Sequence, residues 1–222
     1  SGAAYEGASA RVMNGGNGTD WFDELFDPAT QKNISITASG GSSQGRYHMS
    51  LRYTDAPGTM VYTGFESVTT RLNSEFKIGD KIVVGQNLTA VFDKENYSSA
   101  NGAVQSAAFS SPLVPVRDTN GNFAGTYANS ARTGIANNPI ADLARGSDNY
   151  NKNLKVIGDV YLKYDITPKL KFTSNAGVSM RDLDGRYFTK LNPEHGEAIS
   201  VNDLYENTFT INEWKVSNTL NY

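Results

Sequence analysis

The chain has 222 residues, of which 38% are hydrophobic, a formal net charge of -3 and no cysteine. The small negative charge excludes the strongly basic surface of a nucleic-acid-binding protein, and the missing cysteines exclude disulfides and thiolate metal sites. No apolar run approaches the ~18 residues of a membrane helix. The mean hydropathy of -0.46 suits a soluble domain, but it also suits a membrane β-barrel, because half of each barrel strand faces a polar lumen.

Residues 1–30 are predicted to form a loop that contains one short helix. Small and polar residues dominate 1–18, which indicates irregular chain. Asp20 precedes an amphipathic stretch at 21–26 whose first turn is acidic, as is typical of a helix start, and Pro28 ends that stretch. We expect its apolar side chains to anchor the loop to the surface below, rather than to contact a ligand directly: Trp21, Leu25 and Phe26.

Strict alternation of apolar and polar residues predicts four strands within 31–93. Successive side chains of a strand point to opposite faces, so each of these strands has one apolar face. Turns at 40–43 and 79–80 are short enough for hairpins, whereas a longer connection runs through 55–64. The apolar face carries Ile34, Ile36, Ala38, Tyr47, Met49, Leu51, Tyr53, Val68, Leu72, Phe76, Ile78, Ile82, Val84, Leu88, Ala90 and Phe92.

The connection 94–152 is far longer than an ordinary loop, so we expect it to be functional or to contain small elements of its own. Within it, the proline-bounded piece 111–116 is predicted to be structural. Its aromatic residues, mixed with Asn, Ser and Gly, supply stacking surfaces and hydrogen bonds. The candidate contacts with a substrate or a lid protein are Tyr97, Phe109, Arg117, Phe123 and Tyr127. The alternative, that these side chains pack the loop on itself, stays open.

The clearest element is the hairpin 153–182, in which two alternating strands flank a turn at 167–169. Both strands alternate for longer than the ~5–6 residues usual in globular sheets. Their length is close to the ~9–11 residues that a tilted strand needs to cross a bilayer. A second long connection is predicted at 183–206, and a last strand at 207–222 carries Trp214 on its apolar face.

Short and long connections alternate along the chain, with short turns near Gly40, Gly79 and Thr167. Outer-membrane barrels have short periplasmic turns and long extracellular loops. The pattern therefore predicts an all-β fold, namely about seven strands of a large antiparallel transmembrane β-barrel. Bacterial barrels have an even number of strands, at least eight, and no open edge in lipid. We expect the first and last strands to pair with sequence outside this chain.

The barrel interpretation assigns two sets of residues to the membrane. The lipid-facing set is Leu51, Leu72, Leu88, Val156, Val160, Leu162, Leu170, Phe172 and Val178. An aromatic girdle near the short turns would consist of Tyr47, Phe76, Tyr164, Phe172 and Tyr222. Each of these aromatic residues alone could belong to an ordinary sheet, but as a set they favour the barrel.

Catalysis has little support in the sequence, which contains only His48 and His195. The segment 194–197 places His195 between glutamates but lacks metal-ligand spacing, and we expect it to be a solvated loop. Residues 118–122 resemble the start of a calcium-binding loop, but the required glycine and distal glutamate are missing. A hairpin turn at 120–121 is the better account. We predict no enzyme activity, no catalytic residue, no metal and no cofactor.

The order of several short motifs resembles the SusC/RagA family of TonB-dependent outer-membrane transporters. None of them is diagnostic alone, but their order and spacing over nearly the whole chain are fairly specific. The motifs are Gly18-Thr19-Asp20-Trp21 with Asp23-Glu24-Leu25-Phe26, Thr37 to Ser42, Tyr47 to Tyr53, Arg71-Leu72-Asn73, Val84 to Leu88, Ser111 to Val116, Asn138 to Ala141, and Asn218 to Tyr222.

The resemblance implies an interior fragment of the barrel, with no counterpart to the family's signal peptide, plug, TonB-contacting segment and later strands. It implies a pore subunit in the outer membrane of a Gram-negative bacterium that imports bulky nutrients, either glycan or peptide. The implied partners are a SusD-like surface lipoprotein that acts as a lid, TonB through a part of the chain not present here, the substrate and outer-membrane lipid, but no nucleic acid.

A different class of protein, a soluble or surface-anchored β-sandwich that binds glycans or mediates adhesion, is the alternative. It predicts that the apolar faces pair into a buried core and that loops at both ends have similar lengths. The asymmetry of the connections argues against it.

Overall fold

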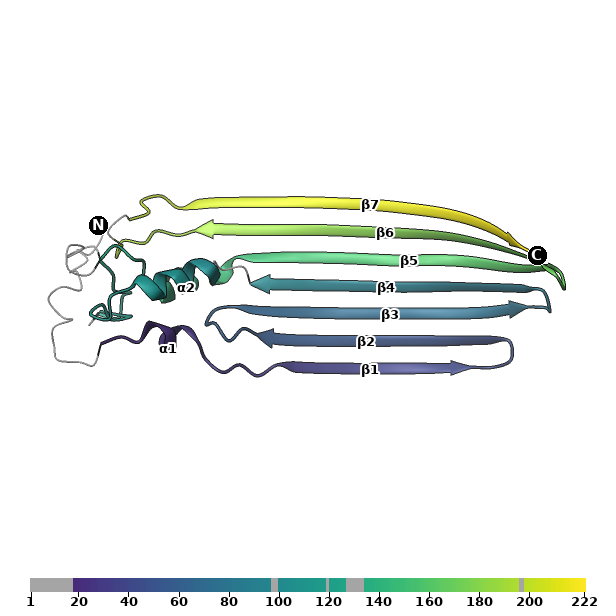
Figure 1. The fold of residues 1–222 in the computed structure, drawn as a ribbon, viewed down its shortest axis with the longest axis horizontal. Coiled ribbons are helices and arrows are strands. Elements are labelled where there is room, and N and C mark those ends of the chain that lie inside the picture. The colour runs from purple at the N-terminus through teal and green to yellow at the C-terminus, as the bar shows by residue number, and fades with distance from the viewer. Residues whose placement is uncertain (1–17, 97–99, 119, 127–133, 196–197) are drawn as a thin grey trace.

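The computed structural model describes residues 18–96, 100–118, 120–126, 134–195 and 198–222. Seven strands form one antiparallel sheet in which each strand pairs with the next in sequence (Figure 1). The strands are β1 Lys32–Gly41, β2 Gly45–Pro57, β3 Gly64–Ile78, β4 Ile82–Asn96, β5 Tyr150–Thr167, β6 Leu170–Thr189 and β7 Asp203–Asn221. The predicted fold class is confirmed. The β-sandwich alternative is wrong, because the described strands form a single sheet.

The two ends of the sheet differ (Figure 1). At one end, short turns join β1 to β2, β3 to β4 and β5 to β6. At the other end lie the long connections and the helices, which are α1 Trp21–Leu25, α2 Ala100–Phe109, α4 Pro139–Arg145 and the 3-10 turn η2 Gly146–Asp148. None of the helices in the described ranges has the length and apolar character needed to cross a membrane.

The longest strands extend further toward the helical end than the sequence pattern predicted. β6 continues to Thr189 and β7 begins at Asp203, so the predicted connection 183–206 shrinks to 190–202. Alternation reveals a strand only where one face is apolar. Beyond Asp182 each face mixes apolar and polar side chains, but the backbone pairing continues to Thr189 opposite Asp203. For the same reason the connection predicted at 94–152 begins after Asn96 and ends before Tyr150.

Register places the apolar positions of neighbouring strands in rows on one face. One row runs from Met49 through Leu72, Leu88, Gly158 and Val178 to Trp214. All residues predicted to face lipid lie on this face, and their side chains are partly or largely exposed. We call the rows between the Ile78–Ile82 pair and the Val68–Phe92 pair the apolar belt.

The height of the apolar belt follows from the strand geometry. Residues 68 to 78 of β3 span it, which is a rise of roughly 33 Å along the strand. A barrel strand tilts by roughly 35–45°, so the belt would be about 25 Å tall, the height expected of a barrel's lipid-facing band. The next row toward the helical end is charged and contains Glu66, Lys94, Lys152 and Asp184. This row marks the upper border of the belt.

The buried core does not lie on the sheet but among the helices and connections. Its members are Trp21, Leu25, Ala103, Ala107, Val114, Ala124, Ile140 and Leu143, with Met60, Val61, Val116 and Phe123 packed against them. We call this packed assembly of α1, α2, α4 and the neighbouring connections the loop cluster.

Candidate functional site in the loop cluster

Helix α1 anchors the first connection to the long one. Asp20 caps the helix by accepting hydrogen bonds from the backbone N–H groups of Phe22 and Asp23. The buried Trp21 donates from Nε1 to the carbonyl oxygen of Ser111 at 3.1 Å. Thr19 donates from Oγ1 to the carbonyl of Val114 at 2.8 Å. The predicted anchoring is thus confirmed for this helix.

The remaining predicted anchors differ in burial. Leu25 is fully buried, whereas Phe26 remains 40% exposed and forms an isolated β-bridge with Met60. The proline-bounded segment 111–116 receives the bonds from Thr19 and Trp21. It includes a turn in which Val114 N–H donates to the carbonyl of Ser111 at 3.1 Å. This segment is structural, as predicted.

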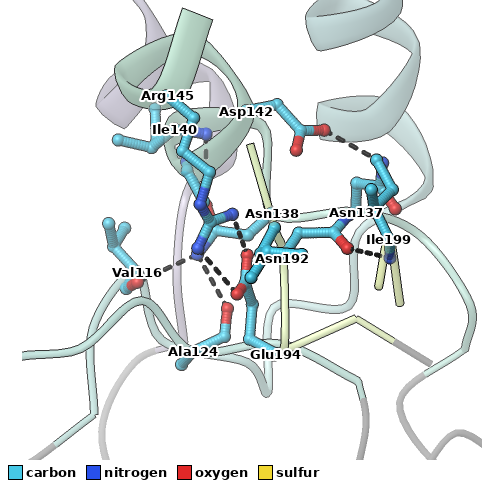
Figure 2. A network of polar contacts seen from close by, with 12 residues as sticks. Val116, Ala124, Asn137, Asn138, Ile140, Asp142, Arg145, Asn192, Glu194 and Ile199 are labelled. Carbon is cyan, nitrogen blue, oxygen red and sulfur yellow. Dashed lines mark hydrogen bonds and ion pairs between the residues drawn. The ribbon is translucent and has the colours of Figure 1, made fainter. Parts of the chain in front are cut away.

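Asn138 joins α4 to the segment before it (Figure 2). Its Oδ1 accepts from the backbone N–H groups of Ile140 and Ala141, both at 3.1 Å, which caps the helix. Its Nδ2 donates to the carbonyls of Val116 at 2.9 Å and Ala124 at 2.8 Å. The side chain is buried, so its four bonds replace water for four separate backbone groups. An asparagine directly before a proline is a sequence signal for the N-cap of a helix, and it could have identified this role of Asn138.

A buried ion pair fastens the long connection to the connection between β6 and β7 (Figure 2). Arg145 at the end of α4 makes a bidentate contact with Glu194, with Nη2 2.7 Å from Oε2 and Nη1 paired with Oε1. Only 4% of the Glu194 side chain is exposed. A Cβ on Gly125 would lie 2.3 Å from the Glu194 carbonyl oxygen, so only glycine fits there.

The expectation that 194–195 belongs to a solvated loop is wrong. Glu194 and His195 are both buried, because Arg145 neutralises the glutamate and His195 Nε2 lies 2.8 Å from the Ile135 carbonyl oxygen. Gly196 and Glu197 lie outside the described residues. No local signal in the sequence links Glu194 to a cation 49 residues away.

Asp142 is the other acid of this network. Asn137 donates from Nδ2 to its Oδ2 at 3.0 Å (Figure 2). Burial raises the pKa of the Asp142 carboxyl above its usual value, against the opposing effects of the Asn137 hydrogen bond and the nearby Arg145. Among the described residues, no group of three side chains could hold a metal ion.

An open cleft of about 730 Å³ adjoins this network. Its walls come from α2, from the segment before α4 and from the β6–β7 connection. They comprise Gln105, Ser106, Phe109, Ile135, Ala136, Asn137, Asn192, His195 and Ile199. Phe109 is 73% exposed and Ile135 is 67% exposed. The cleft therefore offers apolar surface beside amide and imidazole groups, which suits binding better than catalysis.

Of the three predicted substrate or lid contacts that lie among the described residues, only Phe109 lines this cleft. Arg117 and Phe123 contact each other instead, because the guanidinium lies 4.1 Å from the ring centroid and donates to the Gly121 carbonyl at 2.9 Å. The guanidinium of Arg145 lies 5.4 Å from the centroid of the same Phe123 ring. Tyr97 and Tyr127 lie outside the described residues.

The segment between Arg117 and Phe123 is the tight turn that the sequence predicted. Asp118 Oδ1 accepts from the backbone N–H groups of Asn120 at 2.8 Å and Asn122 at 2.9 Å. Gly121 has a φ of +84°, a conformation that favours glycine. The Asp118 carboxylate is thus used by the turn itself.

The aromatic residues predicted as a girdle lie on the apolar face near the short turns. Two of them cover glycines of the neighbouring strand, since a Cβ on Gly40 would meet the Tyr47 hydroxyl and one on Gly45 would meet the Phe76 ring. The others are Tyr164 and Phe172, which are directly opposite each other on β5 and β6. Tyr222 follows β7 and is 95% exposed.

The opposite, polar face carries a network of its own near the short turns. Glu75 accepts from the Tyr161 hydroxyl at 2.7 Å and pairs with Arg46 at 2.9 Å and Lys163 at 3.4 Å. The Tyr161 ring lies across Gly85, where a Cβ would be 2.2 Å from its Cζ. The two cations at this level therefore share one carboxylate within the sheet.

Comparisons with known proteins agree with this architecture, although no family model matches the chain. TonB-dependent receptor P26 of Formosa agariphila is 25% identical over 228 residues, which cover 99% of the chain and 22% of that protein. TonB-dependent receptor SusC of Bacteroides thetaiotaomicron is 27% identical over 181 residues, which cover 72% of the chain and 18% of that protein. The chain thus spans about a fifth of the length of these curated relatives.

A solved structure has the same fold. The RagAB peptide importer in its closed-closed state superposes with a TM-score of 0.69 at 20% identity, over 92% of this chain and 23% of that chain. The resemblance indicated by the sequence motifs is thereby confirmed: the chain resembles the SusC/RagA family of TonB-dependent receptors, as part of a large β-barrel of the Gram-negative outer membrane.

Proposed function

We propose that this chain forms part of the wall and part of the extracellular mouth of a TonB-dependent importer of bulky nutrients. One observation carries the proposal: the sheet has a mostly apolar belt on one face, and every long connection among the described residues packs into one cluster at a single end of the strands. Such an asymmetric layout is typical of an outer-membrane barrel. The nutrient is a glycan or a peptide, and a SusD-like lipoprotein closes the mouth.

The apolar belt meets lipid in this proposal. Polar side chains fill the other face, so turning the belt inward would place Glu75 and Arg46 in hydrocarbon at a high energetic cost. The predicted girdle aromatics would sit at the periplasmic interface, where Tyr and Trp rings combine an apolar body with a polar tip. The charged row of Glu66, Lys94 and Lys152 would mark the outer interface.

The cleft beside Phe109 is the proposed contact with cargo or lid. Its exposed Phe109 and Ile135 supply apolar area, and Asn137 and Asn192 supply amides held in place by the network around α4. An aromatic ring beside fixed amides recognises the face and the hydrogen-bonding edge of a sugar or a peptide. The buried pair of Arg145 and Glu194 keeps the walls together.

The test is the substitution Phe109→Ala in the intact transporter. We expect weaker nutrient uptake or loss of the lipoprotein lid, with an unchanged heat-modifiable barrel in gels. Leu113→Ala is the matched control, because Leu113 is 49% exposed in the same connection but does not line the cleft. Unchanged uptake and lid retention in a correctly assembled Phe109→Ala transporter would refute the role of the cleft. Uptake that persists without TonB would refute the importer itself.

A further inference from the structure

Four cationic side chains gather on the polar face, away from the loop cluster. Lys155 on β5 is directly opposite Arg181 on β6. Arg52 on β2 belongs to the same row through its partner Thr69. Arg71 on β3 lies diagonally beside Arg52, since it pairs with Ser50. We call these four residues the cationic band.

The cationic band lies at the height where the apolar belt ends on the other face. Thr69, in the row of Arg52 and Lys155, directly follows Val68, whose pair with Phe92 borders the belt. Lys155 is five residues from the end of β5 that joins the loop cluster and 12 from its short-turn end, and Arg181 is eight and 11 residues from the corresponding ends of β6. Arg71 lies at the middle of β3. Anything that enters the barrel from the loop end would reach this band early.

No carboxylate among the described residues neutralises the cationic band. Within that part of the chain none of its four members forms an ion pair, and all four are exposed. The contrast is with Glu75 on the same face, which pairs with Arg46 and Lys163. Like charges directly opposite each other in a sheet are destabilising. The cationic band therefore lowers the stability of the sheet, whereas the Glu75 carboxylate offsets the repulsion between Arg46 and Lys163.

The nearest acids have other partners or lie to one side. Asp93 accepts from the Ser67 hydroxyl at 2.6 Å and from Asn153 Nδ2 at 3.1 Å. Arg181 donates to the Oδ1 of that same asparagine at 2.9 Å. Glu213 on β7 is opposite Ser179, diagonal to Arg181. Glu95 is four residues beyond Val91 along β4, which is roughly 13 Å.

Four hydroxyl residues lie among the cations, namely Ser50 on β2, Thr69 on β3, Thr89 on β4 and Ser179 on β6. The two apolar residues among them are Val91 on β4 and Ile157 on β5. Arginine and lysine bind carboxylate and sulfate oxygens through charge-assisted hydrogen bonds. Serine and threonine hydroxyls both donate and accept, as sugar hydroxyls do.

From this arrangement we infer that the cationic band binds anionic groups of the cargo, and that the cargo is an oligosaccharide bearing carboxylate or sulfate groups. The inference rests on the proposed function, because it needs cargo to pass along the polar face. The hydroxyl-rich surroundings favour an acidic glycan over an acidic peptide. The two cation pairs lie on either side of β4, roughly 10 Å apart across the strands, so anionic groups repeated along an oligomer can bind both.

The experiment uses the intact transporter, purified in detergent, with its binding of three oligomers of equal length measured by calorimetry. The probes are an oligogalacturonate, a neutral maltooligosaccharide and an oligoglutamate. We expect the oligogalacturonate to bind most tightly, with an affinity that falls as salt is added. The double variant Lys155→Gln with Arg181→Gln should weaken its binding roughly tenfold or more. Lys94→Gln is the matched control, because Lys94 lies on the opposite face.

Several results would overturn the inference. They are equal affinity for the neutral and acidic sugars, tighter binding of the oligoglutamate, or no loss in the double variant. Pairing of Lys155 and Arg181 with the transporter's own carboxylates in a structure of the whole protein would overturn it as well. Each of these results leaves the proposed function standing, because that function fails on a different observation, uptake that persists without TonB.

Discussion

The sheet and the loop cluster of this molecule are built on opposite principles. Every strand pairs with its neighbour in sequence, so the sheet needs only local alternation and short turns. The loop cluster depends on contacts between distant residues, such as Thr19 with Val114, which are 95 residues apart. The sheet repeats a simple pattern of alternating residues, whereas the loop cluster is stabilised by a few specific polar side chains. We therefore expect a substitution in one region to destabilise that region and to leave the other intact.

The largest difference between the two regions is expected when the ion pair between Arg145 and Glu194 is broken. Arg145→Ala leaves Glu194 charged and buried, and breaking such a pair costs about 3–5 kcal/mol. The loop cluster should open while the barrel stays assembled. Opening is measured by the rate at which a cysteine at buried Ala107 reacts with a dipyridyl disulfide, because this chain has no other cysteine.

The control for this prediction is the exposed pair between Lys190 and Asp148, at 2.7 Å. Lys190→Ala should change the cysteine reactivity little, since exposed pairs contribute at most ~1 kcal/mol. Equal reactivity in the Arg145→Ala and Lys190→Ala variants would contradict the proposed importance of the buried pair. Loss of the heat-modifiable barrel in either variant would contradict the independence of the two regions.

The next largest effect concerns the sheet. Val160→Arg places a charge in the middle of the apolar belt, which should cost roughly 2–4 kcal/mol of barrel stability. Thr173→Arg, on the polar face opposite Lys163, should cost far less because that face is hydrated. Urea unfolding of the intact transporter in vesicles measures both values. A spin label at Val160 that reports water rather than lipid would reverse the assignment of the two faces.

The same contrast explains how far the sequence alone could lead. The seven strands, the two faces and the asymmetry of the connections were predictable, because alternation is a local signal. The ends of β6 and β7 were not, since alternation fades where both faces meet water while pairing continues to Thr189. Glycines such as Gly125 give no warning that they lie against a distant backbone.

The loop cluster was predictable only in part, and for an equally physical reason. Trp21 and Asp20 carry local signals for a capped, anchored helix, and those expectations agree with the structure. Glu194 and His195 look like solvated residues in sequence, because nothing nearby indicates the cation that buries them. The lining of the cleft by Ile135 was also missed, since an isolated apolar residue in a polar segment has no periodic pattern.

A smaller effect is expected from Asn138, which stabilises the loop cluster without a charge. Asn138→Ala removes the cap of α4 and the donor to the buried carbonyl of Ala124. The Val116 carbonyl also loses the Asn138 donor but still accepts from the backbone N–H of Ala124 at 3.1 Å. Losing the cap costs about 1 kcal/mol, and the Ala124 carbonyl, which loses its Asn138 donor, adds about 1 kcal/mol or more. The reactivity of the cysteine at Ala107 should rise, but less than in the Arg145→Ala variant.

Its control is Asp20→Ala, which removes only the two exposed capping bonds of α1. We expect that variant to cost about 0.5–1 kcal/mol. An equal loss in Asp20→Ala and Asn138→Ala would contradict a stabilising role for the bonds from Asn138 to the two carbonyls.

The smallest expected effect is a pH dependence that belongs to the loop cluster alone. Burial raises the pKa of Asp142 above its usual value, so the folded cluster binds this proton more tightly than the open one. Stability from this group is therefore fully present below the ordinary aspartate pKa of about 3.9 and is lost as pH rises through the raised value. Asp148 acts in the opposite direction, because its hydrogen bond with Lys190 lowers its pKa. Asp142→Asn should remove only the first contribution. The ratio of cysteine reactivities at Ala107 between wild type and variant should thus grow with pH across that window, and a ratio that stays constant would show that Asp142 is not the group responsible.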